Sequence, residues 1–237
     1  MRRKTSSKGD VRRKAVEILK VLREKVGIIE EGFVTLEADR RKEDPFKILI
    51  ATILSQNTSG KNSIRAYQNL SKRFELKPDV LANANIKDIE DAIKVAGLYK
   101  SKSIAIKEVS KQILERYGGN LWKVLKKPVE EARKELLSLP KVGQKTADVL
   151  LLFVAKKPTI PIDTHIMRIS KRLGFVDEKA GYEDVRRKLM EIFPRKSYLE
   201  AHLLLIMFGR RICRARKPLC STCPIKNYCP YPSKTTS

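Results

Sequence analysis

The chain has 237 residues, and its 51 Lys and Arg residues against 27 Asp and Glu residues give a formal charge of +24, which points to a polyanionic partner, foremost nucleic acid. Hydrophobic residues make up 42%, which is enough for a folded core and excludes intrinsic disorder for most of the chain. The apolar stretches 147–155 and 203–208 are far shorter than a membrane span, and no apolar region follows the basic start MRRKTSSKGDVRRK, so we expect an intracellular, cytoplasmic or nucleoid protein without a signal peptide or membrane association.

Helical spacing of apolar residues dominates the chain from residue 11 onward. Residues 1–10 are basic, small and polar and are predicted to form a disordered arm, with Asp10 as the N-cap of the first helix. Hardly any stretch alternates apolar and polar residues for long enough to form a strand, so the predicted fold is all-α. The predicted helices span residues 11–26, 46–54, 64–74, 80–84, 86–95, 102–117, 121–125, 129–138, 145–155, 164–173, 182–192 and 198–208.

The segment 136–151, LLSLPKVGQKTADVLL, predicts a helix end, a Pro-x-x-Gly turn and a new helix. Pro140 stops the first helix, and Gly143 permits the backbone to lie close to another surface. The new helix presents unpaired N–H groups at its start, which suit an anion such as a phosphate. The segment alone fits an ordinary helix–turn–helix connection equally well, but the +24 charge favours contact with a nucleic-acid backbone.

All four cysteines lie within 17 residues near the end of the chain, with the spacing C-x6-C-x2-C-x5-C. They are Cys213, Cys220, Cys223 and Cys229. Four thiolates from a short loop can enclose an iron–sulfur cube or one tetrahedral zinc ion, whereas two disulfides gain little in a cytosolic chain. The spacing by itself leaves the iron–sulfur and zinc interpretations open.

Taken together, these motifs resemble those of the helix-hairpin-helix DNA glycosylases of the endonuclease III family. The resemblance rests on LPKVGQKTA, PTIPIDTHIMRISKRLGF, AGLYKSKS and the terminal cysteines, and it runs from about Pro45 to Pro230. It implies two helical lobes: a barrel domain of residues 38–157 that carries the hairpin, and a cluster domain of residues 11–37 and 158–237. The cysteine spacing is that of the family's [4Fe–4S] cluster, which we expect to stabilise a loop too short to fold on its own.

The resemblance also implies two catalytic residues, Lys145 in the hairpin motif and Asp163 in the following Asp-Thr-His element. An amine can attack the sugar C1′ as a damaged base departs, and it then forms a Schiff base that allows β-elimination. Attack requires a neutral amine, so we expect partial burial to lower the pKa of Lys145 from its ordinary ~10.4. Asp163 is expected to stabilise developing positive charge, to assist proton transfer and to cap the next helix. Without the resemblance, a solvated lysine and a purely capping aspartate are the ordinary interpretations.

Further residues are expected to contact DNA. In the family a glutamine after the second helix fills the gap left by an everted base, and ungapped comparison places Asn57 there with Gln56 adjacent; a simple polar turn is the alternative. The lysine at 141 departs from the family's usual glycine and costs about 1 kcal/mol if its φ is positive. Alternatively, the turn differs slightly and Lys141 adds a phosphate contact. The other expected DNA contacts are Lys141, Val142, Gly143 and Thr146 in the hairpin, and Arg214, Arg216 and Lys217 in the cysteine loop, where a solvated charge run is the alternative.

The sequence therefore predicts a monomeric base-excision repair enzyme that acts on double-stranded DNA carrying a damaged base or an abasic site. The expected reaction is excision of an oxidised pyrimidine followed by strand cleavage through a lysine Schiff base. Three alternatives remain open: a uracil or thymine mismatch glycosylase of the same superfamily, a non-catalytic hairpin module that binds DNA, and an RNA-binding zinc protein.

Overall fold

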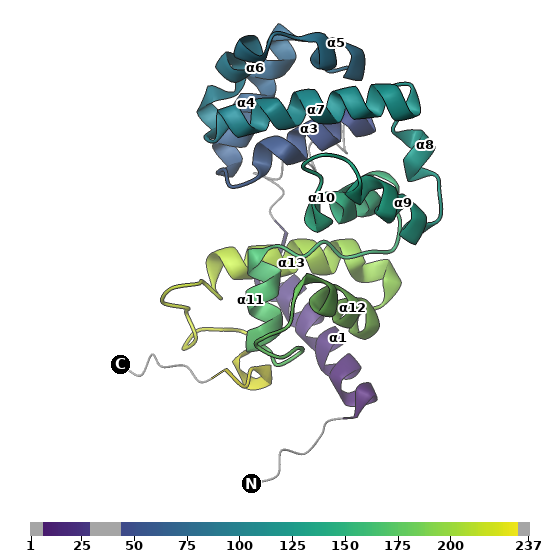
Figure 1. The fold of residues 1–237 in the computed structure, drawn as a ribbon. Helices are drawn as coiled ribbons and strands as arrows, with labels where there is room; N and C mark the ends of the chain where they lie inside the picture. Colours follow the sequence, from purple (N-terminus) through teal and green to yellow (C-terminus); the bar gives the residue numbers. More distant parts are fainter. Residues whose placement is uncertain (1–6, 29–43, 232–237) are drawn as a thin grey trace. The chain divides into compact units, whose positions relative to one another are not determined.

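The structure is a computed structural model that describes residues 7–28 and 44–231. Every regular element in these two ranges is a helix, which confirms the all-α prediction. The chain divides into two compact units, one of Met1–Ile29 with Pro158–Ser237 and the other of Glu30–Lys157 (Figure 1). The domain boundary expected at residues 37 and 38 lies outside the described residues. No helix in the described part of the chain is both long and apolar enough to cross a membrane.

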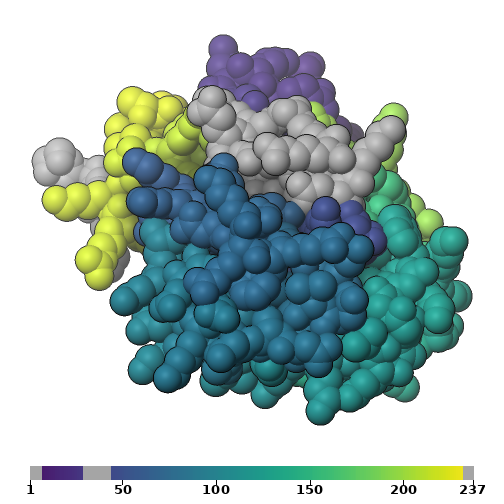
Figure 2. Space-filling view, turned by 90° about the horizontal axis from the view of Figure 1, so that it is seen from above, coloured from purple at the N-terminus to yellow at the C-terminus, as the bar shows by residue number. Residues whose placement is uncertain are grey.

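The unit Glu30–Lys157 is built around a long central helix, α7, which lies along α3, α5 and α6 (Figure 1). Figure 2 looks onto this unit from the side of α5 and α6, where the blue and teal segments form a closely packed surface. Its helices are α3 (Pro45–Ser55), α4 (Gly60–Arg73), α5 (Pro78–Asn83), α6 (Ile86–Ile93), η1 (Lys94–Ala96), α7 (Tyr99–Tyr117), α8 (Trp122–Leu125), α9 (Val129–Leu137), α10 (Gln144–Val149) and η2 (Leu150–Val154).

Helix α3 begins and is buried for simple local reasons. Asp44 caps it by accepting a hydrogen bond from the Phe46 N–H at 2.8 Å, and Pro45 occupies the first turn, where its missing N–H needs no partner. Every residue of the run FKILIATIL except Lys47 is buried, and the run lies in the core of this unit together with the apolar faces of α4, α6 and α7. This burial holds α3, and with it the start of the loop that follows, in the core of the unit.

The second unit contains α1 (Lys8–Lys25), α11 (Thr164–Arg172), α12 (Tyr182–Ile192), η3 (Arg195–Ser197), α13 (Tyr198–Arg211) and η4 (Lys226–Tyr228). Helix α13 is its apolar centre and packs against α11 and α1. The glycine at 209 permits close packing with α11, because a Cβ there would lie 2.7 Å from the Cβ of His165. Figure 1 shows the cysteine loop continuing from the end of α13.

Several helices begin or end a few residues from their predicted bounds; α4, for example, begins at Gly60 and not at residue 64. Two of the differences change the local structure. Helix α1 begins at Lys8, so residues 8–10 do not belong to a disordered arm; residues 1–6 of that arm lie outside the described residues. Ser7, not Asp10, is the N-cap: the two residues form a capping box in which Asp10 is the third helical residue and bonds back to Ser7. The helix predicted over 145–155 changes to a π-helix at Leu150, a tertiary adjustment that apolar spacing does not signal.

Candidate active site and cysteine loop

The hairpin between α9 and α10 is a tight turn closed by a hydrogen bond from the Val142 N–H to the Leu139 carbonyl at 3.2 Å. Pro140 takes the second position of this turn, and Lys141 takes the third with φ +60°. A positive φ at the third position is what a type II turn requires, and glycine is the residue that adopts it without strain. Lysine at 141 therefore holds a strained conformation, which was the first of the two possibilities that the departure from the family's glycine left open.

Lys145 is the second residue of α10, one position after Gln144, and its side chain is exposed. The partial burial that we expected from the sequence is therefore wrong for this structure. The buried face of α10 is formed by the next residues, Thr146 to Val149, and the register of the helix directs Lys145 away from that face. An exposed amine at the start of α10 is accessible to a large ligand such as DNA.

Asp163 caps α11, where its Oδ1 accepts a hydrogen bond from the Ile166 N–H at 2.8 Å. The side chain is half-buried, so the expected cap is present. The capping hydrogen bond uses Oδ1 of the carboxylate, so Oδ2 remains available to interact with a ligand. Lys145 and Asp163 belong to different compact units, and each is held at the first turn or N-cap of its own helix.

The loop after α3 brings one of the two predicted gap-filling residues to the hairpin. The side-chain amide of Gln56 donates to the Thr146 hydroxyl at 3.2 Å, and Thr146 directly follows Lys145. Asn57 is exposed at the turn and has φ +50°. Sequence comparison could not separate the two residues, but the structure places only Gln56 in contact with the residue beside Lys145.

The remaining hairpin residues differ in what they offer to DNA. Val142 and Thr146 are buried, so a contact of either with DNA would have to use main-chain atoms. Gly143 is exposed, and a Cβ placed on it would meet no atom within 4 Å. Its φ of −85° suits any residue, so the fold does not require glycine there. A bare backbone at this point instead leaves the start of α10 open to a close approach from outside.

The strained lysine of the hairpin yields a testable prediction. Lys141→Gly should stabilise the protein by about 0.5 kcal/mol, because release of the left-handed strain exceeds the entropy cost of a new glycine. The same change should weaken DNA binding and lower its salt slope by about 0.9, since one phosphate contact is lost. Urea unfolding and salt-dependent binding to duplex DNA measure the two effects.

Lys141→Ala is the matched control, because it removes the charge but keeps the Cβ that causes the strain. It should weaken DNA binding as Lys141→Gly does and should not stabilise the fold. Equal stability of the two variants would contradict the strain argument.

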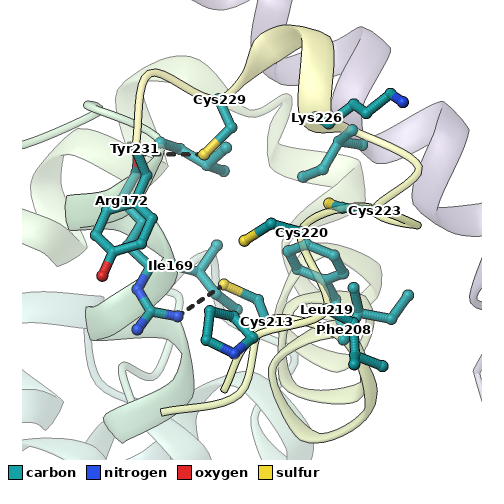
Figure 3. Close-up of a pocket in the computed structure, with 14 residues that line it drawn as sticks. Ile169, Arg172, Phe208, Cys213, Leu219, Cys220, Cys223, Lys226, Cys229 and Tyr231 are labelled. Atoms are coloured by element: carbon teal, nitrogen blue, oxygen red, sulfur yellow. Dashed lines mark hydrogen bonds between the residues drawn. The ribbon is translucent and has the colours of Figure 1, made fainter. Parts of the chain in front are cut away.

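The four cysteines surround one cavity of about 150 Å³ in the second unit (Figure 3). The four cysteines form no disulfide bonds, and Figure 3 shows their sulfur atoms directed into the same cavity. Burial raises the pKa of the Cys223 and Cys229 thiols, so a bound cation is needed to hold them as thiolates. Elsewhere the cavity wall is largely apolar, with Ile169, Phe208 and Leu219 among its residues. Soft, clustered sulfur donors in an apolar shell suit an iron–sulfur group.

Arg172 of α11 ties the cysteine loop to the helical body. Its guanidinium donates to the Cys213 Sγ at 3.4 Å and to the Arg214 and Ala215 carbonyls, and it lies 4.6 Å from the ring centre of Tyr231. Figure 3 shows this arginine between the thiol and the ring. A hydrogen bond to sulfur and a cation–π contact of this kind fix the position of a metal ligand.

The basic residues expected to contact DNA in this loop are all exposed: Arg214, Arg216 and Lys217. Arg214 donates to the Arg211 carbonyl at 3.1 Å, and Lys217 has φ +48°. The loop between the first two cysteines therefore carries its charges on the surface and is anchored at its base by Arg172.

The comparisons with known proteins agree with this description. A family model described as an HhH-GPD superfamily base excision DNA repair protein matches residues 50–195, which is more than half of the chain. A second, described as the iron-sulfur binding domain of endonuclease III, matches residues 213–229. The endonuclease III of Thermotoga maritima is 37% identical over 193 residues, 81% of this chain and 86% of that protein. The chain belongs to the endonuclease III family.

Other relatives extend the match over most of the chain. The endonuclease III of Sulfolobus acidocaldarius is 36% identical over 211 residues, 89% of this chain and 92% of that protein. A solved structure described as a trapped endonuclease III–DNA covalent intermediate, an estranged-adenine complex, has a TM-score of 0.77 and 28% identity and covers 95% of this chain and 97% of the other.

These findings establish the class of enzyme and its cofactor. This member of the endonuclease III family is a bifunctional base-excision repair glycosylase and AP lyase that binds DNA. The match over residues 213–229, the segment that contains the four cysteines, identifies the cofactor as a [4Fe–4S] cluster rather than zinc. The non-catalytic module and the RNA-binding zinc protein are thereby excluded.

Three charged residues of the unit Glu30–Lys157 are buried, and none of them was predicted to belong to the site. Lys102 lies on α7 within the AGLYKSKS motif, and its ammonium is buried behind the loop after α3. Arg133 of α9 and Asp148 of α10 form a bidentate ion pair, with bonds of 2.9 and 3.2 Å, between the two helices of the hairpin. The sequence carried a signal for two of the three: Lys102 shares helical spacing with Ile106, Val109 and Ile113, and Asp148 interrupts an apolar run.

Proposed function

We propose that the protein excises oxidised pyrimidines from double-stranded DNA, with Lys145 as the nucleophile and Asp163 as its partner. The observation that supports this assignment most directly is an exposed primary amine on the first turn of α10, beside the bare backbone of Gly143. A bound duplex would remove water from this amine and so supply the burial that the protein alone lacks.

In the proposed reaction the Lys145 nitrogen forms a bond to C1′ while the bond from C1′ to the damaged base breaks. The base leaves with the electron pair and takes up a proton, and the sugar ring opens to a Schiff base on Lys145. Loss of a C2′ proton then expels the 3′ phosphate, and water hydrolyses the Schiff base to release the lysine. The carboxylate of Asp163 opposes the positive charge that develops at C1′ and assists proton transfer.

We further propose that Gln56 fills the gap left by the everted nucleotide. Its amide lies 3.2 Å from the Thr146 hydroxyl, next to the nucleophile in the chain. Asn57, exposed at the same turn, stays the alternative. Contacts to the DNA backbone would come from Lys141 and from the main chain at Val142, Gly143 and Thr146. In the second unit they would come from Arg214, Arg216 and Lys217.

The [4Fe–4S] cluster, held by the four cysteines, would fix the loop that carries these charges. When bound, the cluster would supply the iron that the cysteine sulfurs ligate. Arg172 donates to a thiol and to two loop carbonyls, and Ile169 and Phe208 line the cavity with apolar surface. We propose that the protein, of 27.1 kDa, works as an intracellular monomer, which gel filtration with light scattering tests.

A panel of duplexes, each carrying one lesion, tests the substrate assignment. Thymine glycol and 5-hydroxycytosine should be released much faster than uracil or thymine opposite guanine. Strand cleavage should accompany release. Faster release of uracil or thymine from the mismatches would replace this proposal with the mismatch glycosylase.

A further inference from the structure

Lys102 holds together two segments that are 38 residues or more apart in the chain. Its ammonium donates to the Leu54 carbonyl at 3.0 Å, to the Thr58 hydroxyl at 2.5 Å and to the Ala96 carbonyl at 3.2 Å. Thr58 in turn donates to the Ala96 carbonyl at 2.5 Å. Through these hydrogen bonds the Lys102 ammonium connects the end of α3, the loop after α3 and the end of η1.

Burial of this ammonium needs an explanation. The residue is only 4% exposed, and all three acceptors are uncharged oxygens, so no Coulomb attraction of a carboxylate offsets the loss of water. The loss of water lowers the pKa of Lys102. Leu54 and Ala96 lie at helix C-termini, where carbonyls lack helical partners and a cation is favoured. The ammonium thus satisfies the carbonyl ends of two helices at one point.

Both segments joined by Lys102 carry strained backbone. Asn57 has φ +50° in one, and in the other Leu98 has φ +48° directly after Gly97 at φ +66°. Leu98 is also 61% exposed, so burial of its own side chain does not hold it in place. Non-glycine residues keep such conformations only where the surroundings fix them, and these sites cluster at functional surfaces.

We propose that Lys102 is a positioning residue for base eversion, in that its buried ammonium fixes the loop bearing Gln56 and Asn57 against the segment Ala96–Leu98. The gap-filling side chains then meet the DNA in a single geometry. This inference rests on the proposed function, because it concerns the same loop. Lys102 itself touches neither the DNA nor the reacting atoms.

Comparison of two substrates tests this role. Excision of thymine glycol from duplex DNA requires eversion and gap filling, whereas β-elimination at a preformed abasic site in a single strand has no base stack to open. Lys102→Met should reduce duplex excision by about 10²-fold, the usual cost of a small misplacement of a reacting group. It should leave single-strand elimination unchanged. A general loss of folding would lower both rates together.

Lys107→Met is the matched control on the same helix. The half-buried Lys107 also donates to a carbonyl, that of Ala84 at 2.6 Å, but it does not touch either loop. Both rates of this variant should equal those of the wild type. Thr58→Val removes the hydroxyl from the same network and should reproduce the split seen with Lys102→Met, and the double variant should lose no more than either single one.

A spectroscopic readout follows eversion directly. In complexes formed with Lys145→Gln protein, 2-aminopurine opposite the lesion should fluoresce strongly because gap filling disturbs its stacking. When the Lys102→Met substitution is introduced into the Lys145→Gln protein, the fluorescence of 2-aminopurine in the complex should decrease.

The outcomes separate this inference from the function on which it rests. If wild-type protein releases no lesion, the proposed function fails. If the wild type is active but Lys102→Met lowers both rates equally, or neither, the positioning role is overturned while the function stands. If Lys102→Met does not fold, the Thr58→Val variant tests the positioning role instead. An unchanged ratio of the duplex excision rate to the single-strand elimination rate rejects the proposal, and a reduced ratio supports it.

Discussion

Replacement of Lys145 with glutamine is expected to abolish strand cleavage and to reduce base release by about 10⁴-fold or more, since it removes the nucleophile that we propose for the covalent mechanism. The residue is exposed on α10, and its aliphatic stem does not form part of the core, so the fold should be unaffected. Binding to lesion-containing duplex should persist, because the hairpin backbone and the cysteine loop retain their contacts. Single-turnover kinetics with a thymine glycol duplex measure both steps.

Lys134→Gln provides the matched control. Lys134 is an exposed lysine on α9, the other helix of the hairpin, and its loss changes the net charge by the same amount. This variant should cleave at the wild-type rate. Cleavage by Lys145→Gln protein at a comparable rate would remove Lys145 from the mechanism.

The second large effect concerns the ion pair between Arg133 and Asp148. Asp148→Leu should destabilise the protein by about 3–5 kcal/mol, because it leaves a buried guanidinium without its carboxylate. Arg133 is 7% exposed and Asp148 is fully buried, so water cannot replace the missing partner. Since the pair joins α9 to α10, the hairpin between them should loosen as well. Urea unfolding measures the change in stability.

The double variant Arg133→Met with Asp148→Leu should recover most of the lost stability, because two apolar side chains can replace a buried ion pair at little cost. Glu75→Gln serves as the surface control: it breaks the exposed pair with Lys77 and should change stability by less than about 1 kcal/mol. A double variant as unstable as Asp148→Leu alone would contradict this account of the pair.

The helices were largely predictable from apolar spacing, as α12 shows: the predicted range and the observed helix are both 182–192. The predicted N-cap of α1 was wrong because two nearby residues can each cap a helix. Ser7 and Asp10 both favour the N-cap, and only the backbone shows that Asp10 is the third helical residue of a capping box. The π-helix at Leu150–Val154 lies in a uniformly apolar run that gives no periodic signal for a change of helix type.

At the site, the sequence identified the residue types but not their surroundings. The strain at Lys141 was foreseen only as one of two possibilities, because proline at the second position suits both the type I turn and the type II turn, and only the type II turn has a positive φ at the third position. The bond between Gln56 and Thr146 joins residues 90 positions apart, and the exposure of Lys145 depends on how α10 packs. Helical spacing places Lys102 on the apolar face of its helix, but the three acceptors that its ammonium finds there are visible only in the fold.

Borohydride trapping followed by peptide mapping tests the central chemical claim most directly. Wild-type protein incubated with a thymine glycol duplex and sodium borohydride should yield a covalent adduct, because reduction of the Schiff base makes it permanent. Mass spectrometry of the digested adduct should place the deoxyribose remnant on the peptide that contains Lys145. An adduct on a different lysine, or release of the base with strand cleavage but no adduct, would contradict the assignment.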